Sequence, residues 1–193
     1  MKDGTLANAT LTPVVSYRQV SSRLRRLHAA WVAAGSPDAW RFWYQDQHER
    51  LAQRAEWYGL PLDRVIAAAA ALSPQRRWSQ NLGDVDRVLG GCDAASFPYL
   101  KQNYWRAVSA LLGEGVGSGP KLNAFRANLT LDLDRVTIDS WMLQCVGWPE
   151  GKSFTGPQYA LLESHIVRVA RSLGIPPAEV QALTWCAARG SDE

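Results

Sequence analysis

Two residues in the middle of the chain, Lys121 and Asp139, have side chains suited to nucleophilic and electrostatic chemistry. A lysine amine attacks electrophilic carbons when its surroundings lower its pKa. A carboxylate that follows an apolar run, here Val136-Thr137-Ile138, needs a partner or a function because an isolated buried charge is costly. The two residues lie 139 − 121 = 18 positions apart, so the fold has to bring them together before they can act on one atom.

The segment before Lys121 predicts a tight turn followed by a helix. Gly117 and Gly119 permit positive φ angles and a close approach of another backbone or of a phosphate. Pro120 suits the first position of a helix, where no N–H is needed. The free N–H groups at such a helix start attract anions, and they disfavour the charge of a lysine in the first turn. We therefore expect a hairpin over residues 112–129 that binds a phosphate.

This pattern resembles the signature of the helix-hairpin-helix DNA glycosylases, the superfamily of endonuclease III and 8-oxoguanine glycosylase. That signature is a Gly-x-Gly-x-Lys hairpin, a helix, and then Val-Asp-x-His. The hairpin glycines and Lys121 match it, and Asp139 matches the aspartate at a spacing that the superfamily uses. The sequence departs from the signature twice, because Glu114-Gly115-Val116 replaces the usual Leu-Pro and Ser140-Trp141 replaces the usual Thr-His.

A second match lies upstream, where Ala71-Leu72-Ser73-Pro74-Gln75 is similar to the Leu-Leu-Ser-x-Gln segment of the same superfamily. In that superfamily the segment ends an early helix and sends a wedge residue into the DNA. The resemblance covers residues 62–146 and implies that Gln75 fills the gap left by a flipped base, with Arg76 and Arg77 against the DNA backbone. From the residues alone, Gln75 is as well explained as an exposed loop residue, and the two arginines as a solvated face.

The resemblance also implies roles for the central residues. Asp139 would stabilise the positive charge that develops on the sugar when the C1′–N bond breaks, and Lys121 would attack C1′ in members with lyase activity. The backbone amides of Gly117, Ser118 and Gly119 would bind a phosphate beside the lesion, and hairpin carbonyls of this superfamily often hold a monovalent cation. The residues alone leave three other roles open, namely Lys121 as a phosphate contact, Asp139 as a helix cap, and the hairpin as a plain turn.

The resemblance implies an all-α fold of two helical lobes with a cleft, and the hydrophobic periodicity agrees with it. Apolar residues recur at helical spacing, and helix start and stop signals divide the chain. The expected helices cover residues 14–34, 37–58, 61–72, 79–89, 98–112, 121–129, 139–146, 156–173 and 176–189. We expect one domain over 14–193, with flanking helices within 14–58 and 156–190, and a flexible lead-in over 1–13. The alternating run 129–134 is the one strand-like segment.

The nine tryptophans invite a role in base stacking, although most tryptophans belong to a core by default. We expect a base pocket lined by Trp43, Tyr44, Trp78 and Trp141. Core positions are expected, from helical spacing, for Trp31, Trp57, Trp105 and Trp185. The three histidines are widely separated and have no partner motif, so we expect them to be surface or core residues.

The composition limits the other possibilities. A chain of 193 residues, 47% of them apolar, suits one domain or two small lobes with a real core. The net charge is only +3, and seventeen of the twenty-one basic residues are arginines, which suit phosphate contacts. Three widely spaced cysteines argue against a disulfide framework, a clustered zinc site and a four-cysteine iron–sulfur cluster. No apolar run resembles a signal peptide or a membrane span, so we expect an intracellular (cytoplasmic) protein. The resemblance implies a monomer, and we expect no resident cofactor.

The sequence therefore favours a DNA glycosylase that acts on double-stranded DNA and leaves an abasic site, with or without lyase activity. The motifs also resemble those of compact glycosylase-like proteins of phages and anti-phage systems. That makes a hypermodified base such as glucosylated 5-hydroxymethylcytosine a candidate substrate. Two alternatives stay open, a non-catalytic helix-hairpin-helix DNA-binding module and an enzyme that edits hypermodified bases without releasing them.

Overall fold

The computed structural model describes residues 14–115 and 117–190, and these form ten α-helices and no β-strand. The expected all-α class is confirmed. The helices are α1 Tyr17–Ala33, α2 Asp38–Arg41, α3 Trp43–Tyr58, α4 Leu62–Leu72, α5 Trp78–Leu89, α6 Lys101–Leu112, α7 Pro120–Leu129, α8 Ser140–Val146, α9 Gly156–Leu173 and α10 Pro177–Arg189. The strand-like run 129–134 is instead a turn, because Asp132 N bonds back to Ala127 O at 2.9 Å. The expected lead-in over 1–13 lies outside the described residues.

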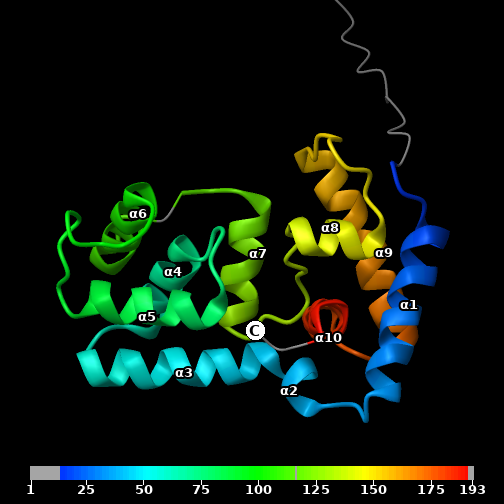
Figure 1. The fold of residues 1–193 in the computed structure, drawn as a ribbon, viewed down its shortest axis with the longest axis horizontal. Helices are drawn as coiled ribbons and strands as arrows, with labels where there is room; N and C mark the ends of the chain where they lie inside the picture. Colours follow the sequence, from blue (N-terminus) through cyan, green and yellow to red (C-terminus); the bar gives the residue numbers. More distant parts are fainter. Residues whose placement is uncertain (1–13, 116, 191–193) are drawn as a thin grey trace, which may run out of the picture.

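The helices lie in two groups, with α7 and α10 between them (Figure 1). One group holds α3, α4, α5 and α6, the other holds α1, α8 and α9, and each surrounds its own cluster of buried apolar side chains. Helix α7 contributes Leu129 to the first cluster and Ala124 to the second. Helix α10 contributes Ala182 and Cys186 to the first cluster and also packs against α1. The two middle helices therefore join the groups.

Helix α4 is the centre of the first group. Every residue from Val65 to Leu72 is buried, and Ala67–Ala71 are all alanines, so α3, α5, α6 and α7 can pack around it. The helix ends before Pro74, which disfavours helical conformation in the residue before it. This end brings Ser73 beside α7, where it lines the same cavity as Lys121.

The helix expected over residues 37–58 is broken at Phe42 into α2 and α3. A contact between residues distant in sequence accompanies the break, since Arg41 Nε donates to Glu179 Oε2 of α10 at 2.6 Å. Local spacing cannot reveal such a contact. As a result α3 begins at Trp43, and both Trp43 and Tyr44 contact side chains of α10.

The extended segment 135–138, which precedes α8, is fastened on one side to α9. The Tyr159 hydroxyl accepts a hydrogen bond from Ile138 N at 3.1 Å and donates one to Val136 O at 2.6 Å. Glu163, one turn further along α9, accepts from Val136 N at 3.1 Å. Both Val136 and Ile138 are buried, so these bonds satisfy backbone groups that water cannot reach.

Asn128 of α7 fastens the same segment from the other side. With the side-chain amide oriented to match its neighbours, the nitrogen donates to Asp132 O at 3.0 Å and to Arg135 O at 3.1 Å. The amide oxygen accepts from Thr137 Oγ1 at 3.1 Å. Asn128 is fully buried, so the segment before α8 is tied to α7 as well as to α9.

The hairpin before α7 follows the sequence-based expectation in part. Gly117 has φ +85°, a value that favours glycine, and α7 begins at Pro120 as predicted. Gly119 has φ 174°, which is ordinary extended backbone, so it does not use the conformational freedom of glycine. A Cβ atom at Gly119 would meet no heavy atom within 4 Å. Space is therefore open beside Gly119, directly before the first residue of α7.

We expect Tyr159→Phe to lower the free energy of unfolding by about 1–3 kcal/mol, because it leaves the buried Ile138 N and Val136 O without a partner. Urea unfolding followed by tryptophan fluorescence measures the change. Tyr58→Phe, at a half-buried position of α3, is the matched control, with an expected change within about 0.5 kcal/mol. Equal stability of the Tyr159→Phe variant and the unchanged protein would contradict the fastening of segment 135–138 by this hydroxyl.

Candidate functional site

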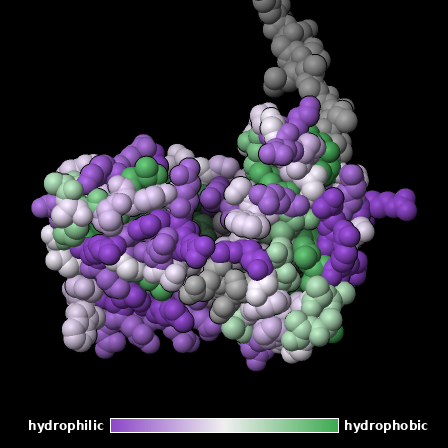
Figure 2. All heavy atoms as spheres, in the orientation of Figure 1, coloured by the Kyte–Doolittle hydropathy of each residue, from purple (hydrophilic) through white to green (hydrophobic). Residues whose placement is uncertain are grey.

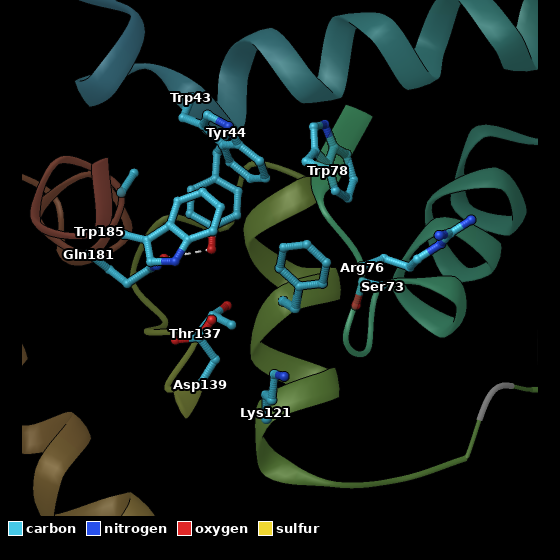
Figure 3. Close-up of a pocket in the computed structure, with 12 residues that line it drawn as sticks. Trp43, Tyr44, Ser73, Arg76, Trp78, Lys121, Thr137, Asp139, Gln181 and Trp185 are labelled. Atoms are coloured by element: carbon cyan, nitrogen blue, oxygen red, sulfur yellow. Dashed lines mark hydrogen bonds between the residues drawn. The ribbon is translucent and has the colours of Figure 1, made fainter. Parts of the chain in front are cut away.

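A cavity of about 90 Å³ lies between the two groups of helices, and Lys121 and Asp139 both line it (Figure 3). The molecular surface is hollowed between the same two groups (Figure 2). Lys121 lies in the first turn of α7, and Asp139 immediately precedes α8. Figure 3 shows both side chains at one end of the cavity, with aromatic rings at the other. The other lining residues are Trp43, Tyr44, Ser73, Arg76, Trp78, Phe125, Thr137, Gln181, Ala182 and Trp185.

Asp139 caps α8 and faces the cavity at the same time. Its Oδ1 accepts from Met142 N at 2.8 Å, which is the helix-cap role that the sequence left open. Burial raises the pKa of Asp139 above its usual range, whereas the bond to Met142 N and the charge of Lys121 act in the opposite direction. The ionised carboxylate is therefore a stronger base than that of an exposed aspartate, and it is suited to accept a proton or to stabilise positive charge.

Lys121 is exposed, and its charge acts on Asp139. Within residues 14–115 and 117–190, no ion pair joins Lys121 to Asp139 or to another carboxylate. The two charged groups thus line one cavity without closing on each other. This arrangement leaves room for a ligand atom between an amine and a carboxylate.

Five aromatic rings line the cavity, and Trp43, Tyr44 and Trp78 are among them as expected. The ring centroid of Trp43 lies 5.1 Å from those of both Tyr44 and Trp78. Phe125 and Trp185 complete the set, with centroids 6.5 and 5.7 Å from that of Trp43. Sequence reasoning missed both. Phe125 follows Lys121 by four positions on α7, and that i,i+4 spacing is a signal that places it on the same face.

Trp141, expected in the base pocket, lies elsewhere. It is 41% exposed and lines a separate groove with Arg23 and Arg26 of α1. The physical reason is helical geometry. Asp139 occupies the cap position of α8, and a residue two positions further along a helix is rotated by about 200° around its axis. Trp141 therefore points away from the cavity that Asp139 faces.

The core positions expected for four other tryptophans are correct in one case. Trp31 is buried, whereas Trp57 and Trp105 are 84% and 58% exposed. Trp185 is half-buried because one side of its ring lines the cavity. Helical spacing identified helix faces, but it did not identify which faces the tertiary packing covers.

Two polar side chains in the cavity are held by buried hydrogen bonds. The Tyr44 hydroxyl donates to Gln181 Oε1 at 2.6 Å, and burial raises the pKa of Tyr44, so the phenol keeps its proton. Thr137 is held by Asn128, as described above. Gln181 and Thr137 were not singled out from the sequence, and no local pattern marks either one.

Gln75 lies in the loop between α4 and α5, with Ser73 and Arg76 of the same loop lining the cavity. Its φ is +60°, a left-handed value that is uncommon for a residue other than glycine. The Gln75 carbonyl accepts from the Tyr99 hydroxyl at 3.1 Å, and the residue is exposed. The loop thus holds an exposed amide side chain beside the cavity in a strained backbone conformation.

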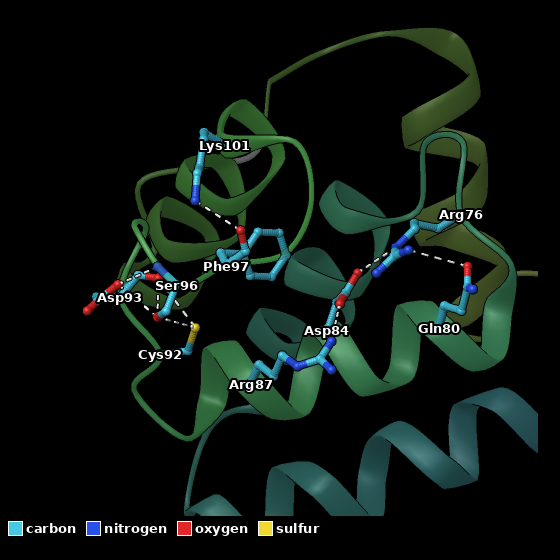
Figure 4. Close-up of polar contacts among 9 residues, drawn as sticks. All are labelled: Arg76, Gln80, Asp84, Arg87, Cys92, Asp93, Ser96, Phe97 and Lys101. Carbon is cyan, nitrogen blue, oxygen red and sulfur yellow. Dashed lines mark hydrogen bonds and ion pairs between the residues drawn. The ribbon is translucent and has the colours of Figure 1, made fainter.

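Arg76, expected against a DNA backbone, is engaged inside the fold (Figure 4). Its Nε donates to Asp84 Oδ2 at 2.7 Å, and Arg87 Nη1 donates to Asp84 Oδ1 at 2.9 Å. Asp84 is completely buried, and a buried carboxylate that loses its partner is strongly destabilising. The guanidinium of Arg76 also lies 4.4 Å from the ring of Tyr99. Arg77, in contrast, is exposed at the start of α5.

A wider groove of about 470 Å³ continues from the cavity along the hairpin. Both spaces share Ser73, Lys121 and Phe125. The hairpin contributes Ser118 and Gly119 to the groove, and it is also lined by Arg106, Thr155 and Gly156. The starts of α7 and α9 therefore meet at the groove, and helix starts favour anions.

Metal and membrane signatures are absent from the part of the chain that the structure describes. No three or more His, Cys, Asp or Glu side chains in it are grouped as metal ligands would be. Cys92, Cys145 and Cys186 form no disulfide bond. None of the described helices has the length and apolarity needed to cross a bilayer.

Asp139→Asn and Asp139→Ala separate the helix cap from the charge. Asparagine caps helices about as well as aspartate, so we expect Asp139→Asn to keep the bond to Met142 N. Asp139→Ala loses that bond, and we expect the free energy of unfolding to fall by about 0.5–2 kcal/mol in urea unfolding. Equal destabilisation by both substitutions would argue against the cap.

Because the pKa of Asp139 is raised, we expect stability to depend on pH differently in the unchanged protein and in Asp139→Asn. The folded protein keeps this proton to higher pH than the unfolded chain, so the burial of Asp139 costs stability as pH rises through that window. Asparagine does not titrate. We therefore expect the stability of Asp139→Asn relative to the unchanged protein to increase from about pH 4 to about pH 7. A decrease over this range would mean that the fold stabilises the carboxylate.

A family model described as a family of unknown function, DUF7178, matches residues 13–192. No curated protein and no solved structure matches the chain. Because the family model spans nearly the whole sequence, the chain belongs to DUF7178.

Proposed function

We propose that the protein is a DNA glycosylase of the helix-hairpin-helix type, which turns one modified base out of double-stranded DNA, breaks its C1′–N bond and leaves an abasic site. The observation that carries the proposal is the shared cavity, with Lys121 and Asp139 at one end and the rings of Trp43, Tyr44, Trp78 and Trp185 at the other. A nucleotide has a flat base and an electrophilic sugar carbon, so its base suits the aromatic end and its sugar suits the charged end.

The aromatic end suits a nucleobase. Stacking of a base on an aromatic side chain contributes about 1–3 kcal/mol, which offsets the few kcal/mol that flipping costs. The cavity of about 90 Å³ matches the liquid volume of roughly three water molecules at about 30 Å³ each. That is space for a single ring system. The side chain of Gln181, oriented by Tyr44, supplies a polar contact for the edge of the ring.

The charged end suits the sugar. As the C1′–N bond breaks, its electron pair leaves with the base and positive charge develops on C1′ and the ring oxygen. The Asp139 carboxylate stabilises that charge in a partly desolvated site, where electrostatic interactions are stronger than in water. It then accepts the proton of the water that attacks C1′, a role that its raised pKa favours.

Lyase chemistry at the same site uses Lys121. In this version Asp139 takes a proton from the lysine ammonium, and the amine then attacks C1′ in place of water. The sugar ring opens to a Schiff base, and elimination of the 3′ phosphate breaks the strand. The space between the amine and the carboxylate is consistent with either nucleophile.

The surroundings of the cavity suit a DNA backbone. The hairpin groove joins the cavity at Lys121 and is lined by two helix starts and by Arg106, which favours a phosphate next to the flipped nucleotide. In this proposal Gln75, which is exposed in the loop that carries Ser73 and Arg76, fills the gap in the base stack. Arg77 is exposed nearby as a further phosphate contact, whereas Arg76 serves the fold.

The same groove sets the range of substrates. The cavity itself has the size of one ring system, so a bulky substituent such as the glucose of glucosylated 5-hydroxymethylcytosine has to extend into the groove of about 470 Å³. The proposed substrates therefore include bases with a small modification and bases with a bulky substituent. A bulky substituent would extend out of the cavity beside Lys121, which lines both spaces.

Asp139→Asn is the variant that tests the proposal. The assay incubates the protein with duplex DNA carrying deaminated, oxidised or alkylated bases and with DNA containing glucosylated 5-hydroxymethylcytosine, then cleaves abasic sites with alkali. We expect base release by the unchanged protein on one of these substrates, and a loss of about 10²–10⁴-fold in Asp139→Asn with little change in DNA affinity.

Asp134→Asn, at an exposed position five residues earlier, is the matched control and is expected to release base at the normal rate. Normal release by Asp139→Asn would overturn the role of Asp139. DNA binding by the unchanged protein without abasic sites on any substrate would support the non-catalytic module instead. Borohydride trapping of a covalent DNA adduct that disappears in Lys121→Ala distinguishes lyase chemistry from simple hydrolysis.

A further inference from the structure

A second groove, of about 400 Å³, lies where α1, α8 and α10 meet, and its lining is basic. Arg23 and Arg26 of α1 line it, and no acidic side chain does. Helix α1 contains four arginines and no aspartate or glutamate, and α8 contains no acidic residue. Among the described residues, neither Arg23 nor Arg26 takes part in an ion pair. The positive charge of this groove is therefore available to an anionic ligand.

The structure holds Arg23 in place before any ligand arrives. A Cβ atom added to Gly147, the residue that ends α8, would lie 2.6 Å from Arg23 Cζ and Nε. The guanidinium therefore lies directly against the Gly147 backbone, at the carboxyl end of α8, where the helix dipole favours a cation. Cys145, which also lines the groove, adds no negative charge because burial raises the pKa of its thiol to about 11.

An aromatic platform lies next to these arginines. Trp141 lines the groove and is 41% exposed, so part of its ring is accessible to a ligand. Arg189 of α10 lies over its ring, with Cζ 5.6 Å from the centroid, and over the ring of Trp185 at 4.5 Å. Trp185 lines the first cavity. Arg189 therefore contacts one aromatic ring of each site.

We propose that this groove binds a single-stranded segment of nucleic acid, with its phosphates on Arg23 and Arg26 and a base stacked on Trp141. Arginine guanidinium groups bind phosphates in a bidentate manner, and an exposed ring beside a basic groove is the combination that binds unpaired strands. A paired base is already stacked, so a duplex cannot use Trp141 fully. The arginines alone indicate that the ligand is an anion. That this anion is a nucleic acid rests on the proposed function.

Fluorescence anisotropy with a labelled oligothymidine of about ten nucleotides, and with a duplex of the same length, tests the groove. We expect Trp141→Ala to weaken oligothymidine binding about tenfold or more, with a smaller effect on the duplex. Arg26→Gln should reduce the slope of log affinity against log salt by about 0.7, the share of one phosphate on a single strand. Trp141→Phe, which keeps an aromatic face, should restore most of the affinity.

Matched controls come from α3, where Trp57→Ala and Arg50→Gln remove an exposed ring and an exposed arginine and are expected to leave oligothymidine affinity unchanged.

Unchanged affinity in Trp141→Ala and Arg26→Gln would overturn the inference, as would equal losses for duplex and single strand. The inference would also be overturned if the unchanged protein bound phosphatidylserine vesicles but not oligothymidine, and if these variants lost the vesicle binding. Oligothymidine binding that depends on Trp141, in a protein that releases no base, would uphold this groove and refute the glycosylase proposal.

Discussion

The geometry of the cavity depends on how the extended segment 135–138 is fastened between α7 and α9. Tyr159 satisfies two buried backbone groups of the segment, and burial raises the pKa of its hydroxyl to about 12, so it remains a neutral donor. Asn128 holds the other side of the segment. Asn128 and Lys121 lie seven positions apart on α7, which places them on the same helix face. One helix therefore presents the amine and also fixes the segment that carries Asp139, so their separation does not depend on a hinge between the two groups of helices.

This rigidity allows the fold to keep two unfavourable features at the cavity. Asp139 is a carboxylate whose burial raises its pKa, and Gln75 has a positive φ. The burial of the Asp139 charge and the positive φ of Gln75 both cost stability. Departures of this kind gather at functional sites in proteins whose other features agree with the fold. Asp84, in contrast, is buried with two arginine partners and belongs to the structural network.

The sequence predicted the features that depend on local chemistry. Helix positions followed from proline, glycine and apolar spacing. The expectation that Lys121 and Asp139 lie at one cavity followed from the hairpin resemblance. Features set by long-range contacts were not predictable. The break at Phe42 accompanies the bond from Arg41 to Glu179, 138 residues away. Gln181 and Trp185 reach the cavity only because α10 packs between the two groups.

Errors at Trp141 and Arg76 had a different origin, since both residues were placed by their distance in sequence from a motif. Trp141 is two positions from Asp139, yet helical rotation directs it to another groove. Arg76 is next to Gln75, yet the buried charge of Asp84 binds its guanidinium. Side-chain direction and charge pairing decide these cases, and neither can be read from spacing along the chain.

A crystal structure with duplex DNA that contains a tetrahydrofuran abasic analogue tests the central claim most directly, since the analogue keeps the sugar ring and lacks the base. We expect the ring between Lys121 and Asp139, with Lys121 Nζ and an Asp139 carboxylate oxygen each within about 3.2 Å of it or of a bridging water. A sugar bound outside the cavity, with the two side chains contacting no part of the DNA, would refute their joint action on one deoxyribose.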